Sequence, residues 1–145
     1  IYILLGGAKL FSTAMTYVQV PQMLTEFAVS FDVPGWVIML IIVLVFLVFG
    51  MFLDAIPILY ITLPILYPVV LSLGYDPIHF AIVTVAALMI GQITPPVGSS
   101  LYAISGHFKE SMGVVVRGAN PYLVGLLVGT IVLLYIPWLS LFLFQ

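Results

Sequence analysis

The chain has 145 residues, of which 64% are hydrophobic and 6% are charged, and its formal net charge is −2. A soluble domain carries about 25% charged residues, so the composition excludes a mainly water-exposed surface and predicts an all-α integral membrane protein that contacts membrane lipid. The small net charge gives no sign of a nucleic-acid partner, and the absence of cysteine excludes disulfides, thiolate catalysis and Cys-based metal sites.

The chain begins within apolar sequence at Ile1, without Met and without a basic leader segment. This start predicts a fragment of a longer polypeptide that has no signal peptide. At about 20 residues per span, the length allows about four to six membrane passes. No long linker or low-complexity tract divides the chain, so we expect a single membrane-domain fragment over residues 1–145.

Residues 1–31 form the first expected element, a kinked membrane span. Pro21 is expected to bend or end its first helix, because proline lacks an N–H and clashes with the preceding turn. Lys9 and Glu26 are expected at the membrane interface. A turn follows before Trp36, with Asp32 as a possible helix cap.

Residues 35–73 are predicted to form a re-entrant helical hairpin. Two apolar helices are separated only by the short, apolar joint Gly50–Asp54, and irregular backbone at membrane depth is tolerated only inside protein or beside a watery cavity. Asp54 suits the N-cap of the second helix, with Pro57 at the third helical position, where proline costs little. Asp54 is also an acid in apolar sequence, which makes it a candidate for ion binding, and this role is compatible with capping the helix.

Residues 77–106 are predicted to form a broken helix. Asp76 is expected to cap it and Pro77 to be its first residue. The consecutive prolines Pro95 and Pro96 cannot both lie in the middle of a helix. The span is therefore expected to consist of two half-helices around an unwound centre, whereas the simpler alternative is a proline kink in a packing helix.

An unwound centre offers polar backbone groups to small ions. The first half-helix would end in free carbonyls that attract a cation, and the second would begin with free N–H groups that attract an anion. Neutral side-chain oxygens suit a weakly bound monovalent cation better than a divalent one. The expected ion-binding residues are Gly50, Asp54, Gly91, Gln92, Thr94 and Gly98. The expected substrate-binding residues are Thr94, Pro95, Pro96, Ser99 and Ser100.

Residues 107–120 form the most polar tract and are expected to lie at the interface, on the cytoplasmic side because of Lys109 and Arg117. Residues 121–144 are expected to form one terminal span. His79 and His107 are not spaced with other metal ligands, so no metal site, cofactor or catalytic set is predicted.

Three segments in this order resemble the large membrane subunit of tripartite ATP-independent periplasmic (TRAP) transporters. They are Gly50–Asp54 (GMFLD), Gly74–Phe80 (GYDPIHF) and Ile90–Gly98 (IGQITPPVG), with prolines between the first two. The resemblance covers nearly the whole chain and the C-terminal third or so of such a subunit. It implies that residues 36–68 are the second hairpin and 78–106 the second broken helix of two inverted repeats.

The resemblance also implies secondary active transport. A sodium-driven symporter with an elevator mechanism would take up a small organic acid, such as a C4-dicarboxylate or a sialic acid, across the bacterial inner membrane. A periplasmic binding protein would deliver the substrate, and a small membrane subunit would be a partner. The alternatives are an elevator-type carrier without a binding protein and a non-transporting membrane scaffold subunit; an enzyme is not expected.

Overall fold

The computed structural model describes residues 2–30 and 34–142, and all regular structure in these ranges is helical. This confirms the expected all-α fold. The cap predicted at Asp32 lies outside the described residues. In chain order the helices are α1 (Tyr2–Tyr17), α2 (Val20–Ser30), α3 (Gly35–Phe52), α4 (Ala55–Ser72), α5 (Pro77–Gln92), α6 (Ser99–Phe108), α7 (Met112–Tyr135) and α8 (Pro137–Leu141).

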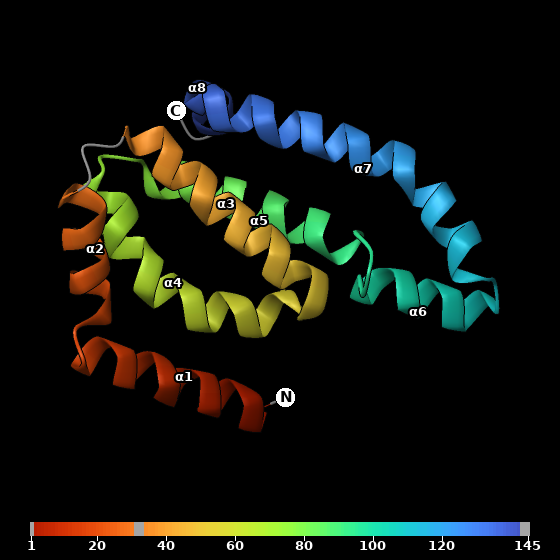
Figure 1. The fold of residues 1–145 in the computed structure, drawn as a ribbon, viewed down its shortest axis with the longest axis horizontal. Coiled ribbons are helices and arrows are strands. Elements are labelled where there is room, and N and C mark those ends of the chain that lie inside the picture. The colour runs from red at the N-terminus through yellow and green to blue at the C-terminus, as the bar shows by residue number, and fades with distance from the viewer. Residues whose placement is uncertain (1, 31–33, 143–145) are drawn as a thin grey trace.

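Helices α3, α4 and α5 form the centre of the molecule, and α3 packs most extensively against α5 (Figure 1). The sequence of α3 is apolar on all sides, so the buried stripe is visible only in the structure. The rings of Phe46 on α3 and Phe80 on α5 meet at a centroid distance of 6.5 Å. The buried core consists of Met39, Ile42, Val43, Phe46, Ile58, Val70, Phe80, Val83, Ala87 and Leu88.

Helices α1 and α2 both pack against α4, and the chain changes direction between them (Figure 1). The bend differs from the one expected at Pro21. Helix α1 ends at Tyr17, and Gln19 adopts a left-handed conformation with φ of +60°. Pro21 then lies in the first turn of α2, where a missing N–H costs nothing because that turn has no intrahelical acceptor.

Helix α4 carries three prolines without ending. Asp54 occupies its N-cap position and Pro57 its third position, as predicted. Pro64 and Pro68 lie inside the helix, which continues to Ser72. Each of these two prolines leaves one carbonyl of the preceding turn without its helical donor.

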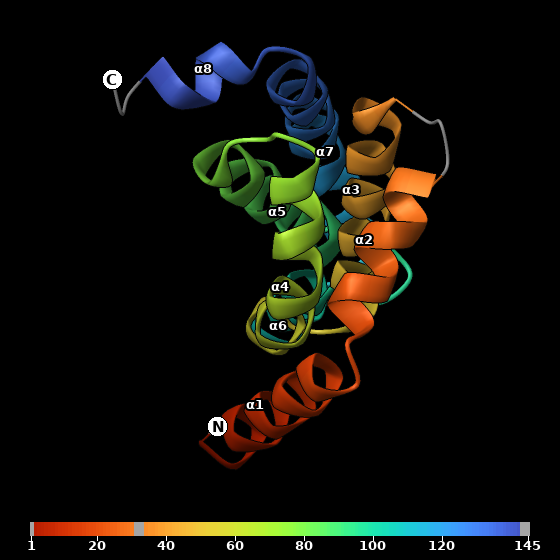
Figure 2. The ribbon, with the colours of Figure 1, turned by 90° about the vertical axis from the view of Figure 1, so that its left-hand side faces the viewer.

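The C-terminal part differs from the sequence expectation in two places. Helix α7 begins at Met112 and passes through Pro121, so it starts nine residues before the predicted span. The missing N–H of Pro121 removes only one helical hydrogen bond, on an exposed turn. Helix α7 ends at Tyr135, because Pro137 disfavours the helical conformation at Ile136, and the short α8 follows. Figure 2 shows α1 and α8 at opposite ends of the molecule.

Three helices in the described residues are long and apolar enough to cross a membrane: α3, α4 and α7. Only 22%, 17% and 6% of their respective apolar windows are buried within the chain, so most of their apolar surface is available to lipid or to other membrane helices. Helix α5 is also apolar but has only 16 residues.

Candidate functional site

The two segments singled out from the sequence lie against each other in the fold. The end of α3 and the end of α5 meet at the point where the chain turns into α6 (Figure 1). The backbone N–H of Gly98, which precedes α6, donates a hydrogen bond of 3.0 Å to the carbonyl of Met51 near the end of α3. This bond joins positions 47 residues apart, so the candidate site is a meeting point of both predicted breaks.

Two glycines let the backbones of α3 and α5 touch beside this bond. A Cβ atom added to Gly91 would lie 2.5 Å from the carbonyl oxygen of Leu47 and 2.8 Å from the Cα of Gly50. A Cβ atom added to Gly50 would lie 3.0 Å from the carbonyl oxygen of Leu88 and 3.2 Å from the Cα of Gly91. A Cβ atom at Gly91 would force the backbones apart, and one at Gly50 would be a tight contact, so the two glycines determine how closely the helices approach.

Helical structure is interrupted between Gln92 and Ser99. The interruption contains the consecutive prolines Pro95 and Pro96, both exposed and joined by a cis peptide bond. Gly98 closes it with φ of +42°, a conformation that glycine adopts without strain from a side chain. The other end of α5 is capped as predicted, because the side chain of Asp76 accepts the backbone N–H of Ile78 at 2.7 Å.

The carbonyls at the end of α5 are only partly free. The carbonyl of Gly91 is not free, since it accepts the N–H of Thr94 at 3.0 Å in a tighter turn. Among the described residues, no donor bonds to the carbonyl oxygens of Gln92 and Thr94. Both oxygens face Gly98, where an added Cβ atom would lie 3.0 Å from the first and 3.1 Å from the second. Two unpaired carbonyl oxygens therefore converge beside Gly98.

The beginning of α6 leaves backbone N–H groups unpaired. The N–H groups of Leu101 and Tyr102 both bond to the carbonyl of Gly98, at 2.8 and 3.3 Å. Those of Ser99 and Ser100 have no acceptor within the described part of the chain. Ser99 is exposed and Ser100 is half-buried, so both hydroxyls lie near this end of the helix. Unpaired N–H groups at the start of a helix are groups that favour a small anion.

Thr94 and Asp54 complete the set of predicted side chains. The half-buried Thr94 hydroxyl donates to the carbonyl of Ile90, so its oxygen keeps lone pairs for another partner. Asp54 is exposed at the junction of α3 and α4, and its side chain makes no capping hydrogen bond. Its position as N-cap is confirmed, whereas the expected capping bond is not formed.

Sequence reasoning missed Met51 as a participant. Its contribution is a backbone carbonyl, and backbone acceptors leave no trace in the amino-acid pattern. The only available signal was its position next to Gly50, inside the joint that was already singled out.

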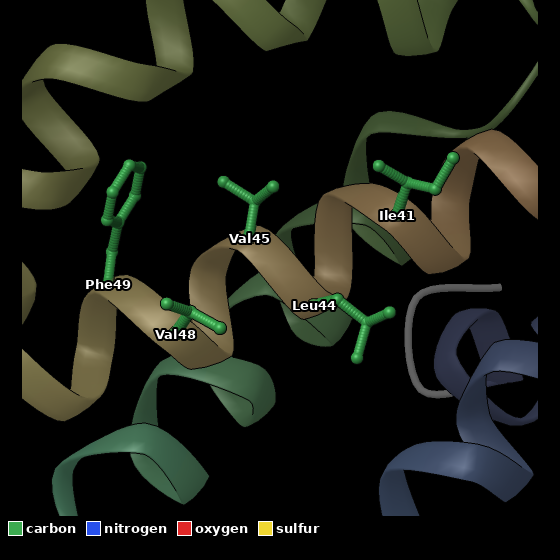
Figure 3. A pocket seen from close by; sticks show the side chains of 5 residues that line it. All are labelled: Ile41, Leu44, Val45, Val48 and Phe49. Atoms are coloured by element: carbon green, nitrogen blue, oxygen red, sulfur yellow. The ribbon is translucent and has the colours of Figure 1, made fainter.

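An open apolar groove of about 250 Å³ lies elsewhere on α3 (Figure 3). Only apolar side chains line it, and none belongs to a predicted site residue. The lining residues are Ile41, Leu44, Val45, Val48 and Phe49. Within residues 2–30 and 34–142, no group of three or more His, Asp or Glu side chains could hold a metal ion.

Comparison with known protein families matches residues 1–139 to the family described as "Tripartite ATP-independent periplasmic transporter, DctM component". A relative in Pseudomonas aeruginosa, the C4-dicarboxylate TRAP transporter large permease protein DctM, is 36% identical over 138 residues, which are 95% of this chain and 32% of that protein. The sialic acid TRAP transporter large permease protein SiaM of Vibrio cholerae is 32% identical over 137 residues, 94% of this chain and 32% of that protein. The chain thus spans about a third of the length of these relatives.

Proposed function

The chain belongs to the DctM component family of tripartite ATP-independent periplasmic (TRAP) transporters, and we propose that it supplies half of a site for sodium-coupled uptake of a small organic acid. The family is one of transporter permeases in the bacterial inner membrane and not of enzymes, which confirms those two expectations. The chain covers about a third of such a permease, so the activity, substrate and partners of the whole protein are part of the proposal.

The observation that carries the proposal is the contact between the two interruptions. The Gly98–Met51 hydrogen bond and the Gly50–Gly91 contact bring the α3–α4 junction to the α5–α6 break. We interpret α3 and α4 as a re-entrant hairpin and α5 and α6 as a broken membrane helix. Such pairs at the midplane are how many secondary transporters build their sites, within inverted repeats. The two would form the second repeat of an elevator-type carrier.

The coupling ion in this proposal is Na⁺. The unpaired carbonyls of Gln92 and Thr94 converge beside Gly98, and the Thr94 hydroxyl oxygen is close in the chain. Neutral oxygens suit a hard cation of single charge that has to be released again. The residues that shape the site are Gly50, Asp54, Gly91 and Gly98. Asp54 lies in the α3–α4 junction and supplies its acid.

The substrate in this proposal is an organic acid. Its carboxylate would bind the free N–H groups and hydroxyls of Ser99 and Ser100, where the α6 dipole favours negative charge. Pro95 and Pro96 would form the exposed rim. The relatives transport C4-dicarboxylates and sialic acid according to their names, so we propose a substrate of that type. A periplasmic binding protein and a small membrane subunit are the proposed partners.

The test is uptake by the complete protein, reconstituted in liposomes with its binding protein and small subunit. Uptake should require an inward sodium gradient. We expect Thr94→Ala to raise the sodium concentration for half-maximal uptake about tenfold, since loss of one oxygen ligand or its positioning bond costs about 1.4 kcal/mol. We expect a shift in the same direction for Asp54→Asn.

Thr25→Ala is the matched control. Thr25 lies on α2, is half-buried, and its hydroxyl bonds to the carbonyl four residues earlier at 2.8 Å, as Thr94 does. It should leave the sodium dependence unchanged. Uptake that ignores sodium would refute the coupling, and unchanged sodium dependence in both T94A and D54N would refute the site.

A further inference from the structure

A buried histidine, His79, links the start of α5 to α8. His79, in the first turn of α5, is 0% exposed. Its Nδ1 lies 2.7 Å from the Oγ of Ser140 on α8, 61 residues later. Ser140 is also buried, at 3% exposure. This is a side-chain hydrogen bond between distant elements in apolar surroundings, where such bonds are strong and their loss is costly.

The partners of Ser140 determine where the imidazole proton lies. The Ser140 hydroxyl donates to the carbonyl of Pro137 at 2.7 Å. A hydroxyl has one hydrogen, so at its contact with His79 the Ser140 oxygen must accept. Nδ1 of His79 therefore carries the proton, and Nε2 is left as a bare acceptor. Nε2 is buried and has no hydrogen-bond partner among the described residues.

The same contacts argue against a charged ring. An imidazolium would place a second N–H at Nε2, where no described acceptor lies, and would bury a charge without a direct partner. The nearby carboxylate of Asp76 is exposed and already accepts the backbone N–H groups of Ile78 and His79, at 2.7 and 3.4 Å.

We propose that His79 is a neutral Nδ1–H tautomer and that its bond to Ser140 holds α8 against the start of α5. The inference does not depend on sodium coupling or on the substrate. The same ring stacks on Tyr75 at 6.2 Å and 19°, and Tyr75 in turn covers Gly35, where an added Cβ atom would lie 3.3 Å from the tyrosine ring. The bond therefore fixes the starts of α3 and α5, at the end opposite Gly50 and Gly91.

The proposal predicts an asymmetry between two substitutions in the complete protein. Ser140→Ala leaves both buried ring nitrogens of His79 unpaired and should lower the folding equilibrium constant about tenfold. His79→Phe keeps a ring and removes both nitrogens, so it should cost less than about threefold. In the H79F background, S140A should have little further effect, because its partner is already gone. Equilibrium unfolding in detergent measures all three.

The protonation state is tested on the unaltered protein by ¹⁵N NMR of labelled histidine side chains. The His79 signals are identified by their loss in H79F, with His107→Gln as the control that removes the other histidine of this segment. We expect a proton on Nδ1 and none on Nε2. An Nε2–H tautomer or an imidazolium would overturn the proposal, as would equal and additive costs of the two substitutions.

Discussion

Glycines at the contact between α3 and α5 and glycines on α7 lie in opposite surroundings. At Gly50 and Gly91 the backbones of two helices touch, and an added Cβ atom would lie 2.5–3.0 Å from the nearest atom. At Gly118, Gly125 and Gly129 of α7, no such atom lies within 4 Å. Glycine thus marks a close approach of helices in one region and an open face in the other.

The difference shows what a small residue contributes in an apolar helix. Where a second helix lies against it, glycine permits a contact that no other residue allows, and this compensates for its conformational cost. Where nothing lies against it within the chain, only the cost remains. Substitution by alanine should therefore lower the free energy of unfolding in the first region and raise it slightly in the second.

The largest effect is expected for Gly91→Ala. The new methyl group would overlap the carbonyl of Leu47 and the backbone of Gly50, so α3 and α5 must move apart. We expect a loss of about 3 kcal/mol in the free energy of unfolding, measured by equilibrium denaturation of the complete protein in detergent. Gly129→Ala on α7 is the control. Equal stability of G91A and the unaltered protein would contradict the described contact.

Gly98→Ala should have the next largest effect. Alanine at φ of +42° is strained, and its Cβ atom would press on the carbonyl oxygens of Gln92 and Thr94, so we expect a loss of about 2 kcal/mol. Gly74→Ala is the matched control, because Gly74 has φ of +80° but nothing within 4 Å of its Cβ position. The difference between the two variants isolates the crowding at the break, and no difference would mean that the carbonyls do not converge there.

Gly50→Ala is expected to cost about 1 kcal/mol, since the closest contact, 3.0 Å to the carbonyl of Leu88, can relax by a small shift. The pair G50A/G91A should cost less than the sum of the single changes, because either one already separates the helices. A denaturation series of the four proteins measures the coupling. Strict additivity would show that the two glycines act at separate contacts.

The smallest effect, and a favourable one, is expected for Gly125→Ala. Alanine is the better helix former by about 0.5–1 kcal/mol, and α7 has room for the methyl group, so stability should rise slightly. The unaltered free energy of unfolding is the reference. A clear loss of stability in the complete protein would mean that another helix packs closely on this face of α7, as α3 and α5 pack on each other.

Local chemistry explains the parts of the fold that could be predicted. Asp76 and Pro77 predict the start of α5, because capping and the missing proline N–H act within a few residues. Asp76 is the N-cap and Pro77 the first helical residue, as predicted. Prolines inside long apolar runs are ambiguous by the same logic. Pro121 lies inside α7, whereas α7 ends just before Pro137, and the sequence alone does not distinguish these two outcomes.

Long-range contacts explain what could not be predicted. The carbonyl of Met51 and the bond between His79 and Ser140 join residues tens of positions apart. No metal site was predicted at His79 because no other ligand is spaced with it, and the sequence pattern gave no sign of its burial or of its hydrogen bond to Ser140. The predicted ion- and substrate-binding residues remain predictions, although the fold brings the segments that carry them together.

The hydrogen bond from Gly98 to Met51 offers a way to follow the contact between the α3–α4 junction and the break. While the α3–α4 junction stays against the break, this amide hydrogen is held between two backbones, and we expect it to exchange slowly with deuterium from solvent. Any step that separates the junction from the break releases it. The deuterium uptake of this one glycine would therefore report whether the α3–α4 junction separates from the break.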